Sequence, residues 1–262
     1  MIGGGRGGGE AQTAGRYLLA ELIDRLDLAL PVQYGGPLVP GNRYIVVSSF
    51  GDDRLVRVLL NQRGLRLTPT DPGPEGYILD VRKGLVIVGG SDRSGTLYGV
   101  QSLLALLSTE SSTPYLKGAL VRDYPYKPVR GVHVYLPATE DIPFFKRFIR
   151  NFLVRYKFNT IFLEVGAGME LRSHPELNLG WERLCRDVFA RGGRPVGPEN
   201  RFQDSVHPEL AGGSYLSREE VRDLVRWARK FRIRVVPEIQ SLTHAYYLLT
   251  THGEFAELET AE

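Results

Sequence analysis

The stretch RVVPEIQSLTHA, residues 234–245, decides how the second half of this chain is interpreted. Its apolar start is typical of a buried strand, and the run stops abruptly at Pro237-Glu238. His244 follows six residues after the glutamate. In β/α barrels, polar side chains at the carboxyl ends of strands face the active site. The elements on either side of this strand therefore decide whether Glu238 and His244 belong to a site.

Predicted strands and helices alternate from residue 130 onward. Strands are predicted for 130–137, 159–166 and 233–239, and helices for 144–157, 218–231 and from residue 244. Ser217 and Glu220 predict a capping box at the start of the 218–231 helix. This alternation indicates parallel strands with right-handed crossovers, which fits a doubly wound sheet or the opening of a (β/α)8 barrel. A long loop predicted at 166–216, after the second strand, favours the barrel.

The first third of the chain has a different pattern. Helices are predicted for 14–26, 55–62 and 94–108, and strands for 42–50, 75–82 and 84–91, the last two joined at Lys83-Gly84. Two prolines in RDYPYKPV, residues 122–129, mark a domain boundary. The predicted fold class is α/β: a small α+β domain over 14–121, then the first three β/α units of a TIM-type barrel over 126–262.

The amino terminus contains GGGRGGG at residues 3–9, which invites comparison with a phosphate-binding loop. Such a loop needs a strand before it and a helix after it, and the sequence predicts only the helix. Residues 1–13 are therefore expected to be a flexible N-terminus. No apolar segment resembles a signal peptide or a membrane span, so a cytoplasmic location is expected.

Charge and histidine spacing exclude several classes of partner. The net charge of +3 is too small to indicate binding to nucleic acid or an acidic membrane. His133 lies in the middle of a predicted strand and is expected to face the core. The remaining histidines apart from His244, namely His174, His207 and His252, have no metal-ligand partners at useful spacing. We therefore expect no metal and no cofactor.

Four polar residues lie at or near the ends of the predicted strands and are candidates for a site: Arg130, Glu164, Glu238 and His244. Arginine can bind sugar hydroxyls or a carboxylate, and a carboxylate can accept hydroxyl protons or act in acid–base chemistry. Histidine can orient or tune a neighbouring carboxylate. The alternative is a solvated or salt-bridged role for each. Glu238 is expected to brace the barrel through hydrogen bonds to loop backbone.

At this point the sequence resembles glycoside hydrolase family 20, the β-N-acetylhexosaminidases. The segment PEGYILDVRKGLVIVGGSDRSGTLYGVQSLLALL, residues 74–107, is similar to the small domain that precedes the barrel in that family. Arg130-Gly131 is similar to the family's opening of the first barrel strand, and YKFNTIFLE (156–164) to its entry into the second. VVPEIQSLTHA is similar to the family's PEI-D-x-P-G-H motif. The resemblance extends over essentially the whole chain.

The resemblance implies that Arg130 and His244 lie beside a sugar pocket, with His244 tuning a catalytic acid. It also implies a substrate-assisted retaining mechanism, in which an adjacent Asp-Glu pair on the fourth strand orients the substrate acetamide and supplies the general acid. No such pair follows His244. Glu164 replaces a histidine of the family, and Ala167 stands near the position of an expected aspartate. Glu164 could bind a sugar hydroxyl in the vacated space.

The sequence therefore predicts a β-N-acetylhexosaminidase-like glycosidase, seen as its small domain and the beginning of its barrel. No catalytic residue is assigned, and the chain is expected to be inactive alone. Arg130, Glu164 and His244 are the predicted sugar-binding residues, and a second chain or a missing C-terminal half would complete the barrel. Two alternatives remain open. One is a non-catalytic carbohydrate-binding or interaction protein, and the other is a different barrel glycosidase, such as one of the α-glucuronidase or O-GlcNAcase-like groups.

Overall fold

The computed structural model describes residues 1–4, 12–110, 113–190 and 207–256. Two compact units are present: one comprises Met1–Pro128 with Arg155–Lys157, and the other comprises Val129–Val154 with Phe158–Glu262. Each unit has a β-sheet of its own. In the part of the chain that the structure describes, no helix is both long and apolar enough to cross a bilayer.

The first unit is built on a six-stranded mixed sheet with the order β2-β1-β3-β5-β4-β8. The strands are β1 (Ile2–Gly4), β2 (Val32–Tyr34), β3 (Tyr44–Ser49), β4 (Tyr77–Arg82), β5 (Leu85–Gly90) and β8 (Ala119–Asp123). The strands β4 and β5 form the predicted antiparallel hairpin. Gly84 in its turn has a φ of +86°, a backbone conformation that glycine adopts without steric cost.

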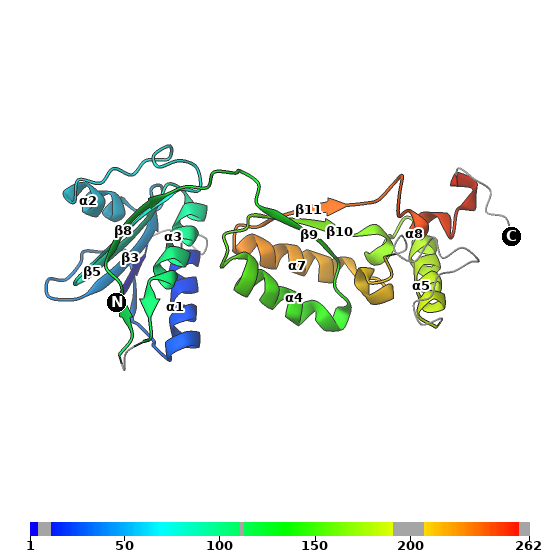
Figure 1. Cartoon of the computed structure of the whole chain (residues 1–262), viewed down its shortest axis with the longest axis horizontal. Helices are drawn as coiled ribbons and strands as arrows, with labels where there is room; N and C mark the ends of the chain where they lie inside the picture. The colour runs from blue at the N-terminus through cyan, green and yellow to red at the C-terminus, as the bar shows by residue number, and fades with distance from the viewer. Residues whose placement is uncertain (5–11, 111–112, 191–206, 257–262) are drawn as a thin grey trace. The chain divides into compact units, whose positions relative to one another are not determined.

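Helices cover both faces of this sheet (Figure 1). The helices α1 (Thr13–Leu26) and α3 (Arg93–Ala105) lie on one face, and α2 (Arg54–Gln62) lies on the other. Val56 and Leu60 of α2 belong to one buried apolar cluster with Ile78 and Ile87 of the sheet. On the α3 side, a Cβ on Gly99 would lie 2.7 Å from a methyl group of Val88. Apolar side chains of the sheet therefore pack against helices on both of its faces.

The amino terminus differs from the sequence-based expectation. Residues 2–4 form β1, which pairs in parallel with β2 and with β3, and Ile2 is fully buried. A flexible segment over residues 1–13 is therefore wrong for β1, and α1 already begins at Thr13. A strand, β1, therefore lies directly before Gly5, where the sequence predicts none. Residues 5–11 lie outside the described residues.

The second unit contains a sheet of three parallel strands with the order β11-β10-β9. These are β9 (Gly131–Tyr135), β10 (Thr160–Glu164) and β11 (Arg234–Glu238), which confirms the three strands predicted from residue 130 onward. The register places Tyr135, Glu164 and Glu238 in one row at the carboxyl end of the strands. The backbone alone thus brings together three side chains that are far apart in the sequence.

Two helical segments pack on the same side of this sheet (Figure 1). These are α4 (Ile142–Phe148), continued by a π-helical turn at Ile149–Leu153, and α7 (Arg218–Lys230). Ser217 and Glu220 form the predicted capping box at the start of α7. Ile161 and Leu163 of β10 are buried, whereas Phe162 between them is exposed. No helix of the described residues covers the face that carries Phe162.

The segment after β10 is not the predicted long loop. It contains α5 (Pro175–Ala190), which begins at a proline. Its buried side chains recur at helical spacing: Leu177, Trp181, Cys185 and Val188. The helix predicted from residue 244 is much shorter than expected, because it comprises only α8 (Tyr246–Leu249) and a 3-10 turn at Gly253–Phe255.

Candidate functional site

The uncovered face of the three-stranded sheet carries a cluster of ionisable side chains at its carboxyl end. His133 lies two residues before Tyr135 on β9, so it points to the same face as Tyr135 and its register partners. The Nε2 atom of His133 is 3.5 Å from Oε2 of Glu164 and 3.3 Å from Oε2 of Glu238. Side chains from all three strands therefore meet at one point.

Glu164 is the most buried member of this cluster, with 3% of its surface exposed. Its Oε1 atom lies 3.0 Å from Nδ1 of His207. Its Oε2 atom is buried and has no hydrogen-bond partner. A buried carboxylate oxygen that lacks a partner carries a desolvation penalty, so it is a favourable position for a ligand that donates a hydrogen bond or a positive charge.

His207 and His244 form an aromatic stack beside Glu164. Their ring centroids are 4.2 Å apart with an interplanar angle of 24°, and the Tyr135 ring lies 5.0 Å from that of His207. Both histidines have a left-handed backbone, with φ values of 51° and 53°. Residues other than glycine adopt this conformation rarely, and such residues are concentrated at functional sites. His244 thus contacts His207, and His207 in turn contacts the buried carboxylate of Glu164.

Glu238 is held by the segment that follows its own strand. Its Oε1 atom accepts a hydrogen bond of 3.0 Å from the side chain of Gln240, and the Tyr247 hydroxyl donates to the Gln240 carbonyl at 2.9 Å. Burial, and then the charge of Glu164, raise the pKa of Tyr247 above its ordinary value. The same two causes raise the pKa of Tyr135. Both phenols therefore stay protonated near neutral pH and can donate hydrogen bonds at the site.

The chain that carries His207 is anchored to the end of β9. The Ala211 amide in the 3-10 turn Leu210–Gly213 donates a hydrogen bond of 2.8 Å to the carbonyl of Leu136. Gly212 has a φ of +64°, and a Cβ at this position would come within 2.7 Å of the Ala138 side chain. The turn can approach the strand this closely only with glycine at this position.

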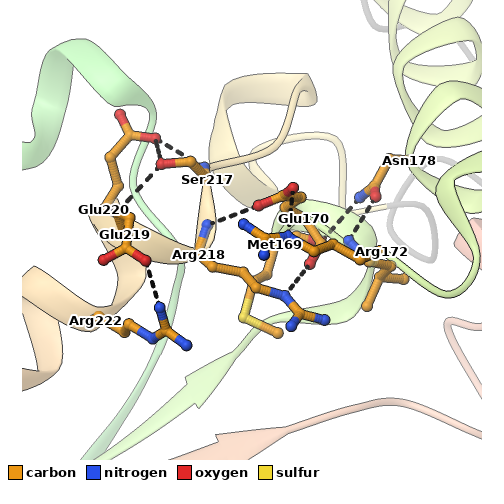
Figure 2. Close-up of polar contacts among 10 residues, drawn as sticks. Met169, Glu170, Arg172, Asn178, Ser217, Arg218, Glu219, Glu220 and Arg222 are labelled. Atoms are coloured by element: carbon orange, nitrogen blue, oxygen red, sulfur yellow. Dashed lines mark hydrogen bonds and ion pairs between the residues drawn. The ribbon is translucent and has the colours of Figure 1, made fainter.

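A second set of contacts fixes the segment that follows Glu164 (Figure 2). The buried Asn178 of α5 donates a hydrogen bond of 2.9 Å to the carbonyl of Met169. It also donates one of 2.7 Å to the carbonyl of Ala167. Glu170 accepts a hydrogen bond of 3.3 Å from the backbone amide of Arg218, the first residue of α7. The end of β10 is thereby tied to both neighbouring helices, which positions Glu164.

The structure brings together three of the four residues predicted for the site. Glu164, Glu238 and His244 lie at the carboxyl end of the sheet, whereas Arg130 precedes β9 at the opposite end. At about 3.3 Å per residue, its backbone is roughly 16 Å from the row that contains Glu164. The backbone amide of Arg130 instead donates a hydrogen bond of 3.0 Å to the side chain of Asn159. That Arg130, Glu164 and His244 share one sugar pocket stays a prediction.

Two residues of the cluster were missed by the sequence analysis. His133 does not face the core, because 45% of its side chain is exposed and the ring lies beside two carboxylates. His207 does have a partner, Glu164. The partner of His207 was missed because a chain reversal brings it to Glu164, and the carboxylates beside His133 were missed because strand register places them there. The sequence did contain a signal for His133. Side chains alternate between the two faces of a strand, so His133 must share a face with Tyr135 at the end of β9.

Comparisons with known proteins agree with this fold. The family described as glycosyl hydrolase family 20, domain 2, matches residues 7–124. A β-hexosaminidase of Vibrio vulnificus is 25% identical over 184 residues, which cover 64% of this chain and 20% of that protein. A β-hexosaminidase of Vibrio furnissii is 28% identical over 190 residues, which cover 69% of this chain and 28% of that protein.

Solved structures extend the similarity to the second unit. The β-N-acetylhexosaminidase of Streptomyces coelicolor superposes with a TM-score of 0.67 and 21% identity, covering 98% of this chain and 45% of that one. A mutant β-hexosaminidase of Streptomyces plicatus, solved with its product GlcNAc, gives 0.66 and 22%, covering 98% and 44%.

The fold has an α/β architecture like that of the hexosaminidases. More specifically, these matches confirm the resemblance to glycoside hydrolase family 20 that was found in the sequence. It spans between a fifth and three-tenths of the length of the curated relatives that it matches.

Proposed function

We propose that this chain forms the front part of a β-hexosaminidase-like glycosidase, whose sheet ends bind a terminal sugar. The observation that carries the proposal is the cluster of Glu164, Glu238 and His244 on the uncovered face of a parallel sheet. In barrel enzymes of this architecture, ligands bind at the carboxyl ends of the strands. Solved relatives with this fold hold N-acetylglucosamine, which makes a terminal N-acetylhexosamine the first substrate to test.

The finer architectural proposal is that β9, β10 and β11 are the first three strands of a (β/α)8 barrel. All-parallel sheets are normally covered on both faces, and here helices cover only one. In a barrel, the uncovered face would be the interior, which is filled by layers of side chains and opens at the carboxyl ends of the strands. The much greater length of the relatives supports this proposal.

The proposed role of this chain is binding and positioning of the sugar. Glu164 and Glu238 offer carboxylate acceptors for hydroxyl groups, and Tyr135 offers a protonated phenol as donor. His244 supports Glu164 through His207. The family mechanism places proton transfer on an adjacent Asp-Glu pair, and the sequence contains no such dipeptide. Cleavage of the glycosidic bond would therefore require groups beyond those in this chain.

A second candidate function is carbohydrate binding without hydrolysis, and the carboxylates of Glu164 and Glu238, which offer acceptors for sugar hydroxyl groups, also fit this function. Both candidates share the sugar site and differ in catalysis. Titration with N-acetylglucosamine, run beside hydrolysis of a nitrophenyl N-acetylglucosaminide, separates them. Binding without hydrolysis by the 262-residue chain is the expected result. Adding back the remaining barrel strands would then restore hydrolysis only if the first candidate is correct.

The role of Glu164 in sugar binding is tested by Glu164→Gln. The amide keeps the size of the side chain but cannot accept hydrogen bonds at both oxygens, so a loss of sugar affinity of about tenfold or more is expected. The control is Glu219→Gln on the exposed side of α7, which should bind sugar like the parent. Equal affinity in the parent and both variants would contradict the placement of the site.

A further inference from the structure

We propose that His133, Glu164 and Glu238 form a binding site for one divalent transition-metal ion, of which Zn²⁺ is the preferred example. One ligand atom from each residue can be chosen so that all three lie within 4.8 Å of one another. These residues lie on three different strands, so the sheet itself fixes their spacing. The inference concerns metal binding and holds whether or not the chain takes part in glycoside hydrolysis.

The distances within the cluster are those of ligands around a metal. Nε2 of His133 is 3.5 and 3.3 Å from the Oε2 atoms of Glu164 and Glu238. Direct N–H···O hydrogen bonds usually measure about 2.7–3.2 Å, so both contacts are long for direct pairing. Two ligands that bind Zn²⁺ at about 2.1 Å with a tetrahedral angle stand roughly 3.4 Å apart. The two distances from His133 therefore match those of paired zinc ligands, and all three ligand atoms lie within 4.8 Å of one another.

An independent observation comes from the hydrogen bonds of the two carboxylates. Glu164 uses Oε1 to contact His207, while its buried Oε2 has no hydrogen-bond partner. Glu238 likewise uses Oε1 to accept from Gln240 and turns Oε2 toward His133. Each carboxylate is thus held by one oxygen and presents the other to the same point. Outer hydrogen bonds that orient metal ligands in this way are a general feature of protein metal sites.

Charge and ligand type indicate the class of ion. Two carboxylates and a neutral imidazole give the site a charge of −2, which favours a cation over a neutral or anionic ligand. An imidazole ligand suits zinc, iron or copper better than magnesium or calcium, which prefer oxygen ligands alone. Three protein ligands leave at least one coordination position for water or a substrate oxygen, as in catalytic zinc sites.

The test is calorimetric titration of the chelator-treated 262-residue chain with ZnCl₂, with MgCl₂ as the comparison. We expect one zinc ion per chain, a much weaker response to magnesium, and a higher melting temperature with zinc. Glu238→Gln and His133→Ala should each weaken zinc binding tenfold or more. Both side chains are more than a third exposed, so these variants should fold, and their circular dichroism and unfolding curves establish whether they do.

The matched control is a second histidine–glutamate pair of the same chain. His174 and Glu176 lie 2.9 Å apart on the surface and belong to no cluster of three ligands among the described residues. His174→Ala should bind zinc like the parent. The absence of zinc binding, or zinc binding that Glu238→Gln and His133→Ala leave unchanged, would overturn the inference. So would loss of zinc binding in His174→Ala.

A sugar titration separates this inference from the proposed function. The same protein is titrated with N-acetylglucosamine after treatment with EDTA and again after addition of ZnCl₂. Zinc binding without sugar binding in either state would support the metal site and contradict the proposed function. Sugar binding in EDTA, combined with no detectable zinc binding, would support the proposed function and overturn the metal site.

Discussion

The six-stranded sheet and the three-stranded sheet of this chain differ in what their faces carry. The sheet of the first unit lies between α2 on one side and α1 and α3 on the other, with apolar side chains on both faces. The sheet of the second unit has helices on one face, and its other face carries His133, Glu164 and Glu238. Burial of both faces stabilises the first sheet, whereas the uncovered face of the second is available to bind a ligand.

Two deeply buried carboxylates, Asp80 in the first unit and Glu164 in the second, are satisfied differently. Asp80 in the first unit is 1% exposed, and it pairs with Arg63 at 2.6 Å and with Arg82 at 3.0 Å. Glu164 in the second unit is 3% exposed, has His207 at one oxygen and lacks a hydrogen-bond partner at the other. The comparison indicates a structural role for Asp80 and a ligand-binding role for Glu164.

The largest expected effect on stability comes from removing Asp80, the carboxylate that pairs with two arginines. Asp80→Ala removes the partner of two arginines, and loss of one member of a buried ion pair typically costs about 3–5 kcal/mol. Glu164→Gln should change the free energy of unfolding by less than about 1 kcal/mol, because it relieves an unsatisfied buried charge. Urea unfolding of both variants measures the difference. Equal destabilisation by the two changes would contradict the assignment of roles.

The packing of the first sheet is tested at Gly89 of β5. A Cβ at this position would lie 2.8 Å from a methyl group of Leu60 and 3.0 Å from one of Leu67. Gly89→Ala should therefore destabilise the first unit by about 1–3 kcal/mol through overpacking. Gly51→Ala is the matched control, because no atom lies within 4 Å of its added Cβ. Thermal unfolding of both variants checks the prediction, and equal melting temperatures would contradict it.

A smaller effect is expected at the helix that covers the second sheet. Ser217→Ala removes the capping box at the start of α7 and should cost about 1 kcal/mol. Because α7 covers the face opposite the site, sugar and zinc affinities should stay at the parent value. Chemical unfolding and the two titrations measure both quantities. A large loss of ligand affinity would show that the two faces of this sheet are not independent.

The smallest expected effect concerns the buried thiol of α5. Burial raises the pKa of Cys185 from 9.0 to about 12, so the thiol stays protonated in the folded state. It should react with Ellman's reagent at pH 8 only when the second unit unfolds. Because the unfolded thiol ionises first, its contribution to stability is present below pH 9 and is lost as the pH rises toward 12. Rapid labelling under native conditions would contradict this burial.

The sequence was sufficient to predict the strands and helices that have clear local patterns. The hairpin of β4 and β5, the helix α7 and the three parallel strands follow from turn residues, capping residues and apolar periodicity. The three-residue strand β1 is too short to show a period. The helix α5 had the apolar spacing of a helix, but the expectation of a long loop concealed it.

The site was predictable only in part. Glu164 and Glu238 were recognisable as strand ends, and the register then confirmed that they are neighbours. The contact of His207 with Glu164 spans 43 residues and depends on the path of the intervening chain, which local patterns do not encode. Arg130 was grouped with them as a polar residue at a strand end, but it precedes β9, and the cluster forms at the opposite, carboxyl end of that strand.

The most direct test of the account is NMR observation of the imidazole resonances of the five histidines during titration with ZnCl₂ and with N-acetylglucosamine. The account predicts that His133, His207 and His244 shift, because they lie on or beside the uncovered face. His174 and His252, which contact surface glutamates away from the strand ends, should stay unchanged. Shifts confined to His174 and His252, or no shift with either ligand, would contradict a ligand site at the strand ends.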